Sequence, residues 1–118
     1  MKQLVEAVLQ DRSTAEVFLF RVQCGCCGGE CGNKPRRFSR AGAAPEDQNR
    51  RIIFDALYQQ EHRQARQFAI RAAAEQMNQC PICRRLVCNG CFLIAEDLDL
   101  CRECARRLGQ TGLSVLPE

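Results

Sequence analysis

Residues 80–104, CPICRRLVCNGCFLIAEDLDLCREC, hold six of the ten cysteines in this chain, arranged as three Cys-x-x-Cys pairs. The pairs are Cys80/Cys83, Cys88/Cys91 and Cys101/Cys104. Two thiolates on one such turn can occupy adjacent corners of the tetrahedron that Zn²⁺ prefers, so each pair supplies half of a metal site. Three pairs therefore leave one half-site without a match.

The missing half-site lies upstream, in the run CGCCGGEC that begins at residue 24. Cys24 and Cys27 form a fourth Cys-x-x-Cys pair there, and four pairs make two complete four-cysteine sites. Cys26 and Cys31 belong to the same run and exceed the eight ligands needed. They are interpreted as buried small apolar residues, as alternative ligands or as redox-active thiols. The sequence predicts two bound Zn²⁺ ions, although an all-cysteine tetrahedron also suits iron.

Length and composition predict a single small domain in a reducing compartment. The chain has 118 residues and can bury only a modest core, which structural metal would supplement. Its longest apolar run, residues 17–20, is far shorter than the roughly 20 residues that cross a membrane, and the N-terminus lacks the features of a signal peptide. We expect a cytoplasmic protein with no membrane partner, where clustered cysteines bind metal more often than they form disulfides.

The formal net charge of +3 is not an indication of nucleic-acid binding. Eight zinc-bound thiolates and two Zn²⁺ ions would together change the charge by about −4, to about −1. The remaining feature is local, because residues 34–51 contain six basic and two acidic side chains, a net charge of +4. The candidate contacts to anions or nucleic acid in this segment are Lys34, Arg36, Arg37, Arg40, Arg50 and Arg51.

Two short elements are predicted before the first cysteine pair. Residues 2–12 carry apolar side chains at helical spacing and predict an amphipathic helix. Residues 15–23 are rich in β-branched and aromatic side chains and predict a strand. These elements and the first zinc knuckle make up residues 1–33, and a basic loop follows over residues 34–45.

A long helix is predicted over residues 46–79. The run Pro-Glu-Asp at residues 45–47 favours a helix start. The two ends of the helix carry apolar side chains, whereas residues 59–64 are polar on all sides, so we expect packed ends and a middle that is exposed or paired with a partner. His62 lies in that middle and is expected to be a surface residue, not a ligand. A helix of this length exceeds what a small finger can cover, which predicts a protein partner or self-association.

Residues 80–109 predict a knuckle, a hairpin and a short helix that ends at Gly109, which together describe a treble-clef finger, and residues 110–118 form a tail. The order C-x2-C, long gap, C-x2-C-x4-C-x2-C, gap, C-x2-C resembles the FYVE zinc finger and its relatives, over residues 24–31 and 80–108. It also resembles cysteine-rich bacterial proteins, for which no activity is implied. The predicted fold class is a small zinc-stabilised α+β domain spanning residues 1–118, with a treble-clef cross-brace finger plus one long α-helix.

In the FYVE family the ligand pairs alternate between two metal ions. The resemblance therefore implies one zinc site made of Cys24, Cys27, Cys88 and Cys91. It implies a second zinc site made of Cys80, Cys83, Cys101 and Cys104. The short step from Cys83 to Cys88 also makes a single site from the second and third pairs cramped. The lipid function of that family is not implied, because residues 75–79, EQMNQ, replace its basic, histidine-containing motif.

These features predict a zinc-binding, non-catalytic interaction module whose helix recruits a protein or a second copy. Sites closed by four thiolates keep no position for a reacting water, so no enzymatic activity is expected. The first alternative is nucleic-acid binding through residues 34–51, with Phe38 available to stack on a base. The second alternative is a thiol-based redox sensor or chaperone that uses Cys26 and Cys31.

Overall fold

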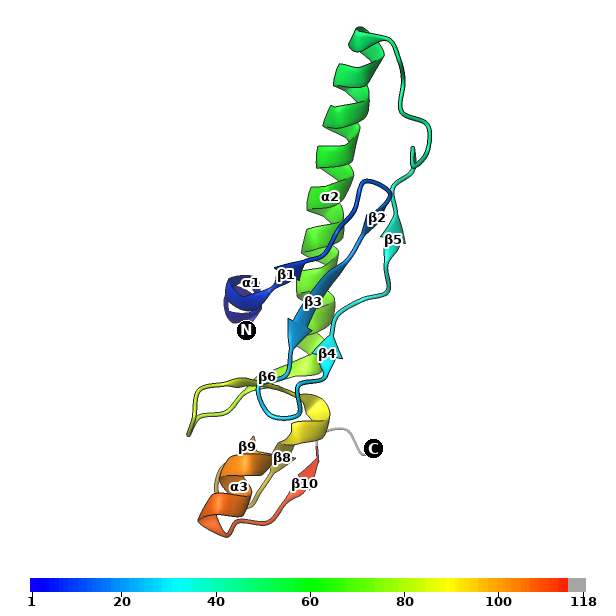
Figure 1. Cartoon of the computed structure of the whole chain (residues 1–118). Helices are drawn as coiled ribbons and strands as arrows, with labels where there is room; N and C mark the ends of the chain where they lie inside the picture. Colours follow the sequence, from blue (N-terminus) through cyan, green and yellow to red (C-terminus); the bar gives the residue numbers. More distant parts are fainter. Residues whose placement is uncertain (115–118) are drawn as a thin grey trace.

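The computed structural model describes residues 1–114, so residues 115–118 of the predicted tail lie outside the described residues. The molecule is elongated, with extents of 65 × 24 × 16 Å, and its long axis follows the helix α2 (Gln48–Gln76) (Figure 1). The cysteine-rich segment lies at the C-terminal end of α2, and the loop that precedes α2 lies at the opposite end (Figure 1). The small α+β fold with one long helix is confirmed.

The N-terminal part of the chain forms one short helix and five short strands. They are α1 (Lys2–Val8), β1 (Gln10–Asp11), β2 (Val17–Phe18), β3 (Phe20–Gln23), β4 (Glu30–Cys31) and β5 (Arg36–Arg37). Strand β3 lies between β1 and β4 in an antiparallel sheet, and β2 pairs with β5. The helix predicted over residues 2–12 is too long, because Gln10 pairs with Arg21 in the sheet. The strand predicted over residues 15–23 is interrupted at Leu19.

The C-terminal part of the chain consists of two β-structures and two short helices. They are β6 (Met77–Gln79), β7 (Leu86–Cys88), the 3₁₀-helix η1 (Asn89–Cys91), β8 (Phe92–Ile94), β9 (Leu100–Cys101), α3 (Arg102–Leu108) and β10 (Leu113–Ser114). Strands β6 and β7 form a hairpin, and β8 lies between β10 and β9. Gly109 caps α3 as predicted, with the left-handed φ of 67° that glycine adopts without steric cost.

Helix α2 contains 29 residues and is shorter than the predicted 46–79. It begins after Asp47, whose side chain accepts a hydrogen bond of 2.9 Å from the amide of Asn49. It ends at Gln76, because Met77–Gln79 pair with β7 instead of continuing the helix. Within residues 1–114, no helix combines the length and the apolar character that a membrane crossing requires.

One face of α2 is packed against the N-terminal strands from its middle to its C-terminal end. Ala65, Ala69 and Ala73 recur every four residues on one face, and each is at most 5% exposed. Ile52 and Ile53, at the N-terminal end, are 63% and 70% exposed. The predicted packing of the N-terminal end is therefore wrong for Ile53, whereas Ala69 and Ala73 confirm the packing of the C-terminal end. Residues 59–64 are exposed except for Glu61 and His62, which are half-buried. Small side chains permit close approach of the strands, so this face needs no large aliphatic residues to be buried.

An aromatic cluster covers this part of α2. Its contacts show that the predictions for Phe38 and His62 are wrong. Phe38 is 1% exposed, and its ring centroid lies 5.2 Å from that of Tyr58, so it is not available to stack on a base. His62 is partly buried, with its ring centroid 5.2 Å from that of Phe20. Its Nε2 lies 2.8 Å from Oδ2 of Asp11. His62 is therefore a core-facing residue and not a surface residue, because strands from the N-terminal part cover it.

Candidate metal centres

Eight of the ten cysteines form two compact groups, and in each group the four sulfur atoms all lie within 4.8 Å of one another. The first group consists of Cys24, Cys27, Cys88 and Cys91. The second group consists of Cys80, Cys83, Cys101 and Cys104. All of these thiols are free, so no disulfide competes with metal binding. The structure thus brings together the two alternating sets that the FYVE resemblance implies.

The two upstream pairs lie on turns with the same backbone hydrogen bonds. The amide of Cys24 donates to the carbonyl five residues later (2.7 Å), and its carbonyl accepts from the amide four residues later (3.1 Å). The turn at Cys80 repeats both bonds, at 3.0 and 2.8 Å. Gly28 and Arg84 occupy the equivalent position in the two turns, with positive φ angles of 75° and 65°. The shared geometry identifies Cys24/Cys27 as a turn of the same kind as Cys80/Cys83.

The two downstream pairs each stand at the start of a helix. Cys88 is the N-cap residue of η1, and Cys101 is the N-cap residue of α3. Each also contacts the turn of its own group through the backbone. The amide of Cys88 donates to Sγ of Cys24 (3.2 Å), and the amide of Cys101 donates to Sγ of Cys80 (3.4 Å). Both groups are therefore built in the same way, from one turn and one helix start.

The first turn reaches its partners because it docks directly on β7. The amide of Gly25 donates to the carbonyl of Leu86 at 2.8 Å. A Cβ atom at position 25 would lie 3.1 Å from that oxygen and 3.1 Å from Cβ of Arg85. Contacts this short leave little room for any side chain other than the hydrogen of glycine. Gly25 thus allows residues far apart in the sequence to share one group of sulfur atoms.

The sulfur separations fit a tetrahedral thiolate site. A Zn–S bond of about 2.3 Å places the corners of a regular tetrahedron about 3.8 Å apart. Sγ of Cys27 lies 3.8 Å from Sγ of Cys88, and Sγ of Cys83 lies 3.9 Å from Sγ of Cys101. Each of these distances joins a turn to a helix start. Both groups therefore have the donor atoms and the spacing that a metal bound by four cysteines requires.

Comparison of the chain with protein-family models, with curated proteins and with solved structures finds no match. The FYVE resemblance therefore rests on the spacing of the cysteines and stays a prediction.

Local contacts favour the thiolate form of some cysteines in each group and disfavour it for others. Burial opposes ionisation of Cys24, but three backbone N–H groups donate to its sulfur and lower its pKa to about 6. Burial also opposes ionisation of Cys83, but the guanidinium of Arg85 lowers its pKa to about 6. Burial and hydrogen bonds with neighbouring thiols raise the pKa of Cys91 and of Cys104. A cation is therefore needed to hold all four sulfur atoms of a group as thiolates.

Cys26 and Cys31, the remaining cysteines, belong to neither group. Cys26 lies on the first turn and is half-buried against the core of the cysteine-rich end. Cys31 lies in β4 opposite Val22 and packs with the cluster between α1, β3 and α2. Burial and the charge of nearby cysteine sulfurs raise the pKa of Cys31 to about 11. The thiolate of Cys31 is thus disfavoured at neutral pH, which is unlike a redox-sensing cysteine.

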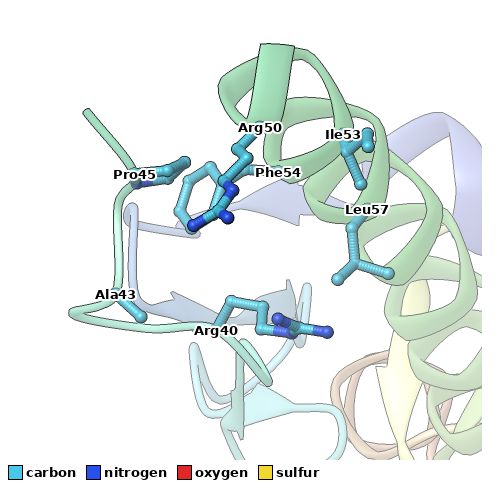
Figure 2. A pocket seen from close by; sticks show the side chains of 7 residues that line it. All are labelled: Arg40, Ala43, Pro45, Arg50, Ile53, Phe54 and Leu57. Atoms are coloured by element: carbon cyan, nitrogen blue, oxygen red, sulfur yellow. The ribbon is translucent and has the colours of Figure 1, made fainter. Parts of the chain in front are cut away.

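The structure distributes the predicted anion-binding residues over several places. The guanidinium of Arg36 lies 4.9 Å from the centroid of the Phe68 ring. Arg40 and Arg50 line one cavity, whereas Arg51 lines another (Figure 2 shows the first). Lys34 is exposed just before β5, and Arg37 is exposed within β5. These six residues therefore do not form one continuous anion site.

Arg85 was not among the predicted site residues, although it connects both groups. Its Nε donates to Sγ of Cys83 at 3.3 Å, and its Nη1 donates to the carbonyl oxygen of Gly25. Its Nη2 lies 2.8 Å from the carboxylate of Glu103 on α3. One guanidinium thus joins the first turn, the second turn and α3. No sequence signal separates this residue from the adjacent Arg84.

We expect Arg85→Met to lower the metal affinity of the second group roughly tenfold to a hundredfold, the usual cost of losing a residue that orients a metal ligand. Arg84→Met is the matched control, because Arg84 is exposed and its side chain makes no hydrogen bond within residues 1–114. Competition with a chromogenic chelator measures both affinities. Equal metal retention in the two variants would contradict a positioning role for Arg85.

Proposed function

We propose that this protein is a zinc-stabilised, non-catalytic interaction module, in which two structural Zn²⁺ ions hold a rigid finger and α2 recruits a protein partner. The observation that carries the proposal is the pair of four-thiolate groups. A metal ion with four protein ligands has no open position for a water molecule or a substrate, as a catalytic zinc would. The chemistry of these groups therefore supports a structural role.

Several features support zinc and a treble-clef cross-brace arrangement. Four cysteines at tetrahedral spacing are the usual ligand set of structural zinc, although an iron ion also suits this set. The second group follows the order of a treble clef: a turn at Cys80, the hairpin of β8 and β9, and a helix that begins after Cys101. The two groups alternate along the chain. The first group takes the first and third cysteine pairs, and the second group takes the second and fourth pairs.

The exposed end of α2 supports the interaction role. The N-terminal strands cover the middle of the helix, and its first turns extend beyond them (Figure 1). Ile52 and Ile53 are more than half exposed there. Large apolar side chains next to one another on a projecting helix are typical of a surface that binds another protein. Nucleic-acid binding has weaker support, because Phe38 is buried and the basic residues are dispersed.

Native mass spectrometry of protein purified without added metal tests the proposal. We expect a mass increase of two zinc ions per chain over the same sample measured under denaturing conditions. Elemental analysis of that sample identifies the metal. One equivalent of metal would contradict the two-site arrangement, and a coloured protein with two iron ions would contradict the assignment to zinc.

A further inference from the structure

A cavity of about 390 Å³ lies between residues 40–45 and the first turns of α2 (Figure 2). Arg40 from the loop and Arg50 from the helix lie on facing sides of it, and the apolar wall includes Phe54 and Leu57 (Figure 2). No carboxylate lines the cavity, and neither guanidinium has a hydrogen bond, an ion pair or a ring contact within residues 1–114. The cavity therefore selects a group that carries carboxylates next to an apolar side chain.

The loop between β8 and β9 has this complementary composition. Residues 95–99 read Ala-Glu-Asp-Leu-Asp. Leu98 is 46% exposed, and the exposed carboxylates of Glu96 and Asp97 have no ion-pair partner in the described part of the chain. Only Asp99 is engaged locally, since its carboxylate accepts a hydrogen bond from the amide of Ala95 at 3.3 Å. The loop thus presents two free carboxylates beside an exposed leucine.

Residues 40–45 and the first turns of α2, which line the cavity, lie at the opposite end of α2 from this loop, in a molecule 65 Å long (Figure 1). The loop cannot reach the cavity of its own chain. We propose that the cavity binds residues 96–99 of a second copy of this chain, with Leu98 against the apolar wall and the carboxylates on Arg40 and Arg50. Because the contact joins two different surfaces, a pair of copies keeps one free cavity and one free loop, and the association continues head to tail.

Charge favours this arrangement over a symmetric dimer through the same cavity. A two-fold contact would place residues 34–51, with their net charge of +4, against an identical segment. The head-to-tail contact instead places this segment against a loop with three carboxylates. The proposal rests on the proposed function in one respect, which is the charge of the metal groups. A divalent ion bound by four thiolates has a formal charge of about −2, and it would lie at the same end of the molecule as the loop. Nucleic acid offers phosphates to the arginines but no aliphatic group for the apolar wall.

Analytical ultracentrifugation of the metal-loaded, full-length chain tests the proposal over a range of protein and salt concentrations. We expect the average mass to rise above that of a monomer as concentration increases, and to fall when salt screens the charges. Arg40→Gln with Arg50→Gln removes the cavity's positive charge, and Glu96→Gln with Asp97→Asn removes two of the loop's three negative charges. Each double variant is expected to be monomeric alone.

An equimolar mixture of the two double variants gives the sharpest result. One variant keeps an intact loop and the other keeps an intact cavity, so the mixture is expected to form a two-chain complex and nothing larger. Arg63→Gln with Arg71→Gln is the matched control, since it makes the same change in charge on α2 outside the cavity and is expected to associate like the wild type. Circular dichroism establishes that each variant is folded.

Three outcomes would overturn the proposal. They are a wild type that is monomeric at every concentration, a dimer that both double variants still form, and a monomeric wild type that binds an oligonucleotide through Arg40 and Arg50. Metal content measured on the same samples reports separately on the proposed function. Two zinc ions in a chain that does not associate would leave the zinc-stabilised finger standing and refute only the head-to-tail contact.

Discussion

Removal of metal with a chelator is expected to unfold the cysteine-rich end, residues 77–108. Five of the eight buried residues in the core of this end are cysteines, and the three others are Val87, Leu100 and Ala105. A structural zinc site contributes on the order of 10–16 kcal/mol in small zinc-finger peptides, comparable with the whole stability of a typical domain. The few apolar residues cannot replace that contribution, so α3 and strands β7 to β9 should lose their amide-exchange protection.

The same experiment contains its own control. The aromatic cluster formed by Phe18, Phe20 and Phe38 packs against Ala65 and Ala69 and contains no metal-group cysteine. Protection in the middle of α2 is therefore expected to fall less than protection in α3. Adding Zn²⁺ back should restore protection, whereas Mg²⁺, which prefers oxygen ligands, should not. Unchanged protection in α3 after complete removal of metal would show that these groups have no structural role.

Two double variants are expected to differ in the number of metal ions that they retain. Cys27→Ser with Cys88→Ser removes two ligands from one group, so one metal ion should be lost and the other retained. Cys27→Ser with Cys83→Ser removes one ligand from each group, so both metal ions should be weakened. Native mass spectrometry during titration with a chelator measures the outcome. Pairing of neighbouring cysteine pairs along the chain would reverse the two results, and that reversal would refute the alternating arrangement.

Single substitutions of the surplus cysteines provide the matching control. Cys26→Ser and Cys31→Ser change thiols that lie outside both groups, so each variant is expected to bind as many metal ions as the wild type. Loss of one metal ion from either variant would mean that the first turn uses a ligand other than Cys24 or Cys27.

Long-range contacts account for most of what could not be predicted from the sequence. The end of α2 at Gln76 depends on pairing between β6 and β7, which a helical pattern does not reveal. The burial of Phe38 and His62 depends on strands that precede them by about 20 to 50 residues. The residues adjacent to them in the sequence are basic or polar, and these residues gave the wrong prediction of exposure for both side chains. Arg85 acquires its role only where the first turn docks on β7.

The features that follow from residue order alone are local. Each Cys-x-x-Cys turn, the N-cap at Asp47 and the C-cap at Gly109 involve residues within a few positions of one another, and short-range geometry is encoded directly in residue order. Spacing alone left open which pairs share a metal ion and whether Cys26 or Cys31 takes part. Only the tertiary structure brings Cys24 to Cys88 and Cys80 to Cys101, because backbone contacts between distant segments, made possible at Gly25, decide which sulfur atoms meet.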